Sequence, residues 1–204
     1  MTFEQFLRET AVRGGLVNTL FEAHLFAMVG TLEKIAGALA SECVPYELIG
    51  GGAVMVQVNR VEPAAVRMTR DIDIMINHSD LERLKVVAAK HGFTFRHAMG
   101  VDMLLPPGEV KALNAIHLIF SGQKTKASQA VPNPPLRPEY LTINGVQVSV
   151  IPVADLVQMK LSNNRDKDRV HVRDMDSVGL ITPDVEASLP VALRNRLAEI
   201  RTSE

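Results

Sequence analysis

Apolar residues recur at helical spacing near both ends of the chain and at strand spacing between them. The spacing predicts a long amphipathic helix from Leu16 to about Glu42, ended by Pro45. Before it, Thr2 and Gln5 have the spacing of a capping box that opens a short helix. The first 45 residues are therefore expected to form a helical segment that packs on the rest of the chain.

Short β-like runs separated by turn residues fill the middle of the chain. The strongest is DIDIMIN, in which two aspartates alternate with isoleucines. The PPG stretch between two such runs predicts a hairpin, and four prolines predict a loop over residues 121–138. Predicted strands cover residues 46–49, 71–77, 93–97, 101–105, 114–120 and 146–151; predicted helices cover residues 53–58 and 80–90, the second capped by Ser79.

From Pro152 onward the pattern is helical again. Two helices are predicted over residues 152–164 and 166–178, and Gly179 ends the second. Thr182 caps and Pro183 opens a third helix, and Pro190 opens a fourth. This order predicts an α/β (α+β) fold: a helical segment over residues 1–45, a core with a mixed sheet and flanking helices over 46–151, and a helical C-terminal extension over 152–204.

Composition narrows the class of protein further. The chain has 204 residues, 47% of them hydrophobic and 22% charged, with a formal net charge of −1, so any site for a polyanion must be local. Cys43 is the single cysteine, which excludes an internal disulfide and favours a cytoplasmic protein. There is no apolar run of membrane-spanning length and no secretory signal pattern at the N-terminus, so we expect no membrane partner.

Asp71 and Asp73 lie in an otherwise apolar run, RMTRDIDIMI. Residues i and i+2 of a strand share one face, so the two carboxylates lie side by side and repel each other unless a cation lies between them. Mg²⁺ takes one or two carboxylates together with water and substrate phosphates, and Mn²⁺ accepts the same ligands. The alternative is that Asp71 caps a turn and Asp73 lies on a solvated strand face.

Three glycines, Gly50, Gly51 and Gly52, stand between a predicted strand and a predicted helix. Glycines there allow the backbone to approach a phosphate closely, with its N–H groups facing the ligand. The spacing matches neither a Walker loop nor a dinucleotide fingerprint. The alternative is a plain turn.

Together, strand, Gly-Gly, helix and a second strand with Asp-x-Asp resemble the nucleotidyltransferase superfamily, which has a DNA-polymerase-β-like core. The resemblance is closer to the AbiEii-type branch of abortive-infection toxins, which reads Gly-Gly-x-Ala and then Arg-x-Ser/Thr-x-Asp-Ile-Asp. The matching residues here are Gly50, Gly51 and Ala53, then Arg67, Thr69, Asp71, Ile72 and Asp73, and later Lys160, Arg165, Lys167, Asp168 and Asp174. The resemblance implies Mg²⁺-dependent transfer of a nucleoside monophosphate from an NTP to an RNA, protein or small-molecule acceptor. It also implies a cognate antitoxin as a possible partner.

The resemblance also implies roles for single residues. Asp71 and Asp73 would hold the metal, and the backbone of the three glycines would hold the triphosphate. Arg67 and Thr69 would bind phosphate oxygens from the loop, and Lys160 and Arg165 from the C-terminal helices. The alternative for Lys160 is the solvated side of an amphipathic helix, and the charge run NRDKDRVHVRD has the spacing of a self-paired helix face.

The chain departs from the superfamily at the third carboxylate, which usually lies on a later core strand. The matching run here is NAIHLIF, with His117 at its centre and no acid. His117 could act as a base or as a ligand better suited to Mn²⁺ or Zn²⁺, or it is a hydrogen-bonded core residue. Asp102, on the predicted hairpin partner, is the rival metal ligand.

Three functions follow from these patterns. The first is a catalytic nucleotidyltransferase that uses Asp71, Asp73 and His117. The second, which the missing carboxylate favours, is a non-catalytic nucleotide- or partner-binding pseudoenzyme on the same fold. The third is an interaction protein that dimerises through the helix predicted from residue 16 to 42; the sequence leaves the oligomeric state open.

Overall fold

A computed structural model describes residues 26–69, 71–110, 114–143 and 145–203. The predicted capping box at Thr2 lies outside these residues, as does the start of the predicted long helix. The described part of that helix spans residues 26–41. Its buried side chains, Ile35 and Leu39 among them, belong to the main hydrophobic core, so this segment packs on the rest of the chain.

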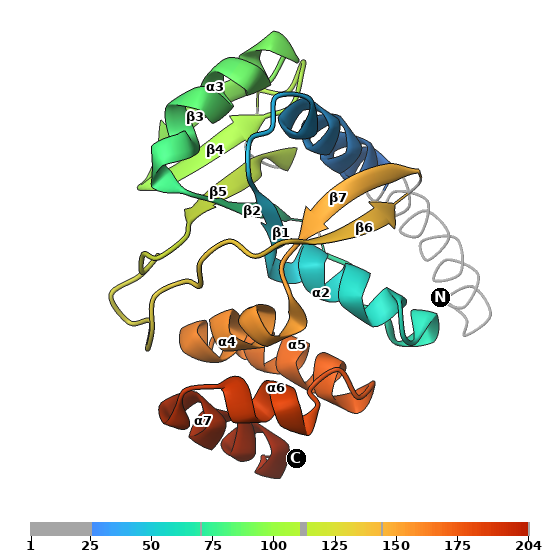
Figure 1. The fold of residues 1–204 in the computed structure, drawn as a ribbon, viewed down its shortest axis with the longest axis vertical. Coiled ribbons are helices and arrows are strands. Elements are labelled where there is room, and N and C mark those ends of the chain that lie inside the picture. Colours follow the sequence, from blue (N-terminus) through green and yellow to red (C-terminus); the bar gives the residue numbers. More distant parts are fainter. Residues whose placement is uncertain (1–25, 70, 111–113, 144, 204) are drawn as a thin grey trace, which may run out of the picture.

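A seven-stranded mixed sheet forms the centre of the molecule, in the order β3-β4-β5-β2-β1-β7-β6 (Figure 1). The pairs β2–β5 and β1–β7 are parallel, and the other neighbouring pairs are antiparallel. The predicted hairpin around PPG is confirmed by the antiparallel pairing of β4 with β5. The strands are β1 Glu47–Ile49, β2 Ile72–Ile76, β3 Thr94–Ala98, β4 Val101–Leu105, β5 Ile116–Phe120, β6 Glu139–Ile143 and β7 Val146–Val150.

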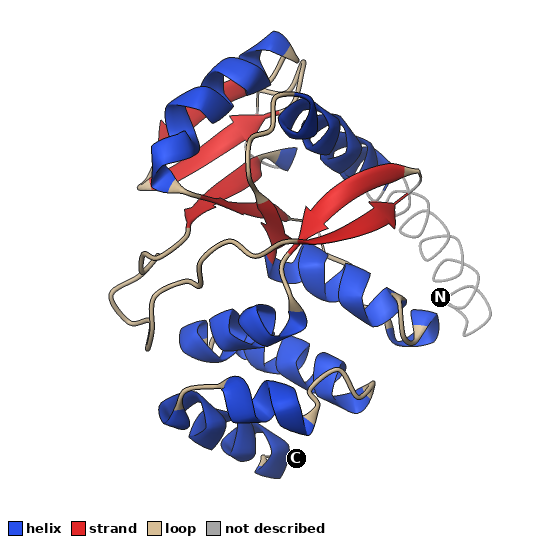
Figure 2. Ribbon diagram, viewed as in Figure 1, coloured by secondary structure: helices blue, strands red, loops and turns tan. Residues whose placement is uncertain are grey.

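The helices lie mostly where the spacing places them. In Figure 2 the C-terminal helices α4 to α7 form a layer at one end of the molecule, and α2 lies between them and the sheet. The described helices are α2 Gly50–Asn59, α3 Leu81–Lys90, α4 Val153–Asn163, α5 Asp166–Ser177, α6 Pro183–Ser188 and α7 Val191–Thr202, with 3-10 turns at Pro63–Ala65 and His78–Asp80. None of them is long and apolar enough to cross a membrane.

Three local predictions are corrected by the structure. Helix α2 begins at Gly50, one turn earlier than predicted, because the glycines form its first turn. Ser79 lies inside a 3-10 turn and does not cap α3. Strand β6 was not predicted; only Leu141 and Ile143 of its residues are partly buried against the core, so its apolar alternation is short.

Strand β2 contributes side chains both to the hydrophobic core and to the polar site described below. Ile72, Ile74 and Ile76 are buried, whereas Asp73 between them is half-buried on the opposite face. Met75 shares the face of Asp73 and is fully buried, so both faces of β2 pack in the core and Asp73 lies where one of them opens on the site. The mixed α/β fold with flanking helices is confirmed. The division of the chain at residues 45 and 151 stays a prediction.

Candidate functional site

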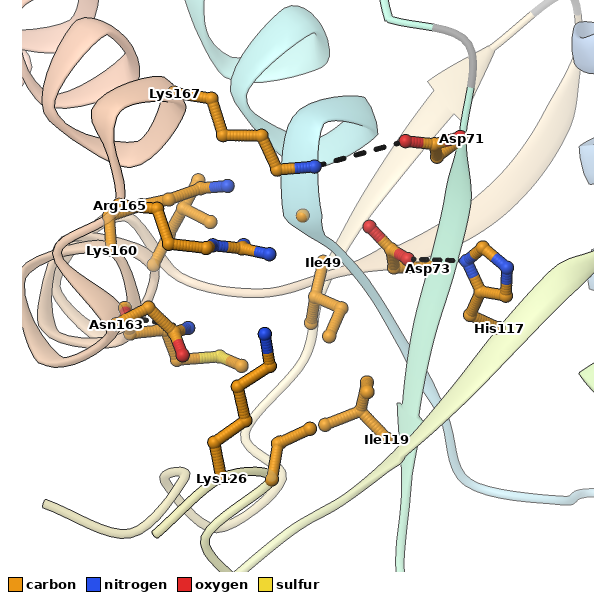
Figure 3. Close-up of a pocket in the computed structure, with 14 residues that line it drawn as sticks. Ile49, Asp71, Asp73, His117, Ile119, Lys126, Lys160, Asn163, Arg165 and Lys167 are labelled. Carbon is orange, nitrogen blue, oxygen red and sulfur yellow. Dashed lines mark hydrogen bonds and ion pairs between the residues drawn. The ribbon is translucent and has the colours of Figure 1, made fainter. Parts of the chain in front are cut away.

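Asp71 and Asp73 line one pocket of about 250 Å³ between the sheet and the C-terminal helices. Asp71 directly precedes β2 and Asp73 lies within it, so both carboxylates reach the same side, as the strand alternation predicts. The pocket is lined by Ile49, Gly50, Asp71, Asp73, His117, Ile119, Thr125, Lys126, Leu156, Met159, Lys160, Asn163, Arg165 and Lys167. Figure 3 shows the two aspartates on one side and the basic side chains facing them.

The first turn of α2 lies against Asp73. Gly50 has φ +69°, and a Cβ atom there would lie 2.1 Å from Oδ2 of Asp73, so both the backbone conformation and the space require glycine. At Gly51 a Cβ atom would lie 2.6 Å from Oγ1 of Thr69. The first N–H groups of a helix have no partner within it and carry the positive end of its dipole. The start of α2 is therefore suited to an anion beside Asp73.

His117 lies directly opposite Asp73 on the neighbouring strand β5. Its Nδ1 is 3.1 Å from Oδ1 of Asp73. This hydrogen bond is the main reason that the pKa of His117 is raised, although burial of the ring opposes it. A protonated or Nδ1–H imidazole donates to the carboxylate, so the ring holds Asp73 in one orientation.

Lys160 and Arg165 are tied together by a buried carboxylate, Asp168. Lys160 is only 4% exposed, and its Nζ lies 3.4 Å from Oδ1 of Asp168. Arg165 donates from Nε to Oδ2 of Asp168 at 2.6 Å. Burial lowers the pKa of Lys160, an effect that Asp168 opposes. The alternative that Lys160 is a solvated helix residue is therefore wrong.

Two further lysines complete the basic side of the pocket. Lys167 of α5 reaches toward Asp71, with 3.9 Å between Nζ and Oδ2. Lys126 comes from the long loop after β5 and points into the pocket in Figure 3. With Lys160 and Arg165, four cationic side chains line the pocket against two carboxylates. The excess of positive charge suits a ligand with several negative charges.

Sequence reasoning missed Lys126, Thr125 and Asn163. Thr125 and Lys126 lie on a loop, where no hydrophobic period marks a residue as facing inward. Asn163 is the last residue of α4, and its position seven residues after Leu156 puts it on the same helix face as Lys160. That spacing was the one signal that could have identified it.

The predicted site residues that do not line this pocket are Gly51, Gly52, Arg67, Thr69 and Asp102. Arg67 donates from Nε to Asp174 at 2.9 Å and does not line it. Thr69 lies under Gly51 and accepts a hydrogen bond from the backbone of Asp71, so its contact is with the loop and not with the cavity.

Asp102, the predicted rival metal ligand, is also placed elsewhere. It pairs with Leu118 in the β4–β5 register, whereas Asp73 pairs with His117 in the β2–β5 register, so the two aspartates lie on opposite faces of the sheet. Its carboxylate lies 2.6 Å from Nδ1 of His97. Asp102 is therefore not part of the group that Asp71 and Asp73 form.

Asp71 and Asp73 are a fitting donor pair for a hard divalent cation. Their oxygens face one cavity, next to a helix N-terminus and several cations that suit phosphates. In the described part of the chain no three His, Cys, Asp or Glu side chains gather in a metal-binding group. Such a pair suits Mg²⁺ or Mn²⁺, which completes its shell with water and phosphate oxygens, and not a closed zinc site.

The comparisons with known proteins bear on the fold. No protein-family model and no curated protein matches the chain. An antigenic nucleotidyltransferase-like protein from Paracoccidioides brasiliensis matches in structure with a TM-score of 0.55 and 17% identity, over 85% of this chain and 86% of that one. This similarity shows that the chain has the nucleotidyltransferase fold, but it does not show the branch of that superfamily.

Two structures of the antibiotic-resistance factor ANT(2'')-Ia are also similar. The solution structure has 16% identity and a TM-score of 0.47, over 87% of this chain and 84% of that one. The crystal structure in complex with adenylyl-2''-tobramycin has 15% identity and a TM-score of 0.48, over 86% of this chain and 98% of that one.

Proposed function

We propose that this protein is a nucleotidyltransferase that transfers a nucleoside monophosphate from an NTP to an acceptor hydroxyl. One observation carries the proposal: Asp73 lies against the first turn of α2 at Gly50, and four cationic side chains line the same pocket. A triphosphate needs this combination of backbone N–H groups, positive charge and carboxylates for a metal.

The chain's own residues would bind the triphosphate from two sides. The backbone of Gly50 lines the pocket at the helix start, and the N–H groups of Gly51 and Gly52 in the same turn would add to the positive end of the helix dipole there. Lys160 and Arg165 are held in place by Asp168, so their positive charges are fixed before the ligand enters. Fixed charges stabilise developing negative charge without the cost of reorganising in the reaction.

Asp71 and Asp73 would hold Mg²⁺ or Mn²⁺, with His117 keeping Asp73 in one orientation. When bound, the metal neutralises phosphate charge and orients the reacting groups. Arg67, Thr69 and Asp102, predicted as direct ligands, become supporting or remote residues in this proposal. Lys126 and Lys167 take their place as direct phosphate contacts.

The reaction joins the acceptor oxygen to the α-phosphorus and breaks the bond from the α-phosphorus to the bridging oxygen. Pyrophosphate leaves, and the acceptor's proton passes to water. We assign no side chain as base, because no third carboxylate lines the described pocket. The acceptor is an RNA 3′ end, a protein hydroxyl or a small molecule; an AbiEii-type toxin with a cognate antitoxin remains one proposal within this class.

One observation favours a second candidate, a non-catalytic nucleotide-binding protein. His117 occupies the strand position at which the superfamily usually carries its third carboxylate. Such a protein would bind NTP and metal through the same residues without turnover.

Calorimetric titration with each of the four NTPs, with and without Mg²⁺ or Mn²⁺, tests the shared site. We expect metal-dependent binding by the wild type and its loss in Asp71→Asn/Asp73→Asn. Asp102→Asn is the matched control, because its carboxylate lies on the other face of the sheet. No binding of any NTP with either metal would overturn the proposal. Pyrophosphate release with candidate acceptors then separates the enzyme from the binding protein.

A further inference from the structure

One face of α4 divides the pocket into a charged part and an apolar part. Leu156 comes three and four residues before Met159 and Lys160, and Asn163 comes four and three residues after them, so all four project from the same side of the helix. Leu156 and Met159 join Ile49 and Ile119 as the apolar lining. The charged part suits the phosphates of a nucleotide, and the apolar part suits the flat face of its base.

Asn163 presents a hydrogen-bond acceptor to this apolar part. Its Nδ2 donates to the backbone carbonyl of Met159, one turn earlier, at 3.1 Å. That bond turns Oδ1 toward the cavity, and Figure 3 shows the oxygen pointing there. Within the described part of the chain, no group donates a hydrogen bond to this oxygen. The helix ends immediately after it, at Asn164 with φ 50°.

The loop that faces Asn163 across the pocket is held by buried amides. Gln129 is 3% exposed, accepts hydrogen bonds from the backbone N–H groups of Thr125 and Lys126, and donates to Asn133 at 3.0 Å. Asn133, also 3% exposed, donates to the carbonyl of Phe120 and to Oγ1 of Thr125. The loop wall of the pocket is therefore held in place before a ligand binds. A fixed wall keeps a base in one position relative to Asn163.

Resting on the proposed function, we propose that Asn163 selects the nucleotide: its Oδ1 accepts a hydrogen bond from the exocyclic amine at C6 of a purine or C4 of a pyrimidine, a position that the C2 amine of guanine does not occupy. Adenine at C6 and cytosine at C4 carry an amine, whereas guanine and uracil carry a carbonyl oxygen at those positions. A carbonyl there would face Oδ1, leaving two acceptors without a proton between them. The site therefore takes ATP and CTP in preference to GTP and UTP.

The preference follows from the fixed orientation of the amide. One N–H of Nδ2 donates to the carbonyl of Met159 and the other has no acceptor in the described part of the chain, but placing an N–H where Oδ1 now lies would require rotating the amide and so losing the bond to Met159. A site built to hydrogen-bond a group on the substrate discriminates strongly against an analogue that lacks the group, because its own polar atom is then left unpaired. Apolar neighbours such as Leu156 offer no replacement partner.

Paired nucleotides that exchange the amine for a carbonyl test this inference directly. We would titrate wild-type protein, in the presence of Mg²⁺, with ATP against inosine triphosphate and with CTP against UTP. We expect the amine-bearing member of each pair to bind at least about fivefold more tightly, as one hydrogen bond allows. In Asn163→Ala both ratios should fall to roughly one, while Asn195→Ala, which removes an exposed amide on α7, should leave them unchanged.

The outcomes separate this inference from the proposed function. Equal, metal-dependent binding of both members of each pair by wild type would overturn the base preference and leave the nucleotide site intact. A preference that survives in Asn163→Ala would show that another group reads the base. Absence of all NTP binding would overturn both proposals. The wild-type comparison does not depend on how well the variant folds.

Discussion

His117 and Asp73 stand opposite each other on adjacent parallel strands, with Nδ1 of the histidine 3.1 Å from Oδ1 of the aspartate. The histidine occupies the place in which the sequence resemblance leads one to expect a third acid. It contacts a proposed metal ligand and leaves the other oxygen of Asp73 facing Gly50. An imidazole in this position orients a carboxylate, whereas the sequence left open a base, a metal ligand or a hydrogen-bonded core residue.

Removing His117 should therefore weaken metal-dependent nucleotide binding. Groups that orient a metal ligand typically change metal affinity about 10–100-fold, and we expect a loss in this range for His117→Ala, with a smaller loss for His117→Gln, which keeps an N–H donor. Titration with Mn²⁺ and NTP measures it. His97→Ala is the control, because His97 makes the same kind of pair with Asp102 on the other face. Equal losses in both alanine variants would contradict the orienting role.

Asp168 should matter more for stability than any exposed carboxylate. It is 1% exposed, holds Lys160 and Arg165, and accepts from the backbone N–H of Arg165 at the start of α5. Asp168→Ala leaves the buried Lys160 without its counter-ion, so we expect a loss of about 3 kcal/mol in the free energy of unfolding. Urea unfolding measures the change.

The exposed ion pair between Asp176 and Arg201 supplies the comparison for Asp168. Asp176→Ala should cost only about 0–1 kcal/mol, because solvent screens a surface pair. Losses of the same size in the two variants would show that Asp168 does not stabilise the buried charges of Lys160 and Arg165.

The framework of the site could be predicted from the sequence, because strand alternation and glycine have simple geometric consequences. Two aspartates in DIDIMIN must share a face, and glycines after a strand allow close approach; the structure brings Gly50 within contact of Asp73. These features depend on local periodicity. The register that places His117 opposite Asp73 joins two strands far apart in the chain, and the sequence pointed to His117 only through the family resemblance.

The remaining parts of the site depend on tertiary contacts that have no periodic signal. Lys126 reaches the pocket only because the buried amides of Gln129 and Asn133 hold its loop. Arg67 matches the family pattern, yet its side chain pairs with Asp174 and does not line the pocket. Asp174 lies more than a hundred positions later in the chain. The charge run NRDKDRV predicts a helix face exposed to solvent, although Asp168 within it is buried.

Glu47 should make the protein less stable as pH rises from about 4.5 to 7. Its side chain is fully buried; Oε1 accepts from the backbone of Arg137, and Oε2 has no described partner. Burial raises its pKa to about 7, so the folded protein binds a proton that the unfolded chain has already released at pH 6. The stability gained from this proton is complete below pH 4.5 and is lost as pH rises through 7.

The variant Glu47→Gln isolates that effect, because the amide keeps an oxygen for Arg137 and has no proton to lose. As pH rises from 4.5 to 7.5, the free energy of unfolding of wild type in urea should fall by roughly 2–3 kcal/mol relative to that of Glu47→Gln. Glu139→Gln, an exposed change on β6, is the control and should follow wild type. Parallel curves for wild type and Glu47→Gln would show that Glu47 is already ionised in the folded protein.

His171 on α5 should have the opposite dependence on pH. Burial, and next the positive charge of Lys160, lower its pKa to about 4, and its Nδ1 has no hydrogen-bond partner among the described residues. The unfolded chain takes up a proton near pH 6.5 while the folded protein does not. The stability contributed by the neutral ring is therefore present above pH 6.5 and is lost as pH falls toward 4.

When the pH falls from 7 to 4, we expect the free energy of unfolding of His171→Gln in urea to fall by roughly 2–3 kcal/mol less than that of wild type. His91→Gln, an exposed change just after α3, should behave like wild type. Because Lys160 is a named cause, Lys160→Met should raise the pKa of His171, which NMR titration of the ring can follow. A ring that titrates near 6.5 in wild type would show that the imidazole beside Gly51 is open to water, and that the charge of Lys160 is screened from it.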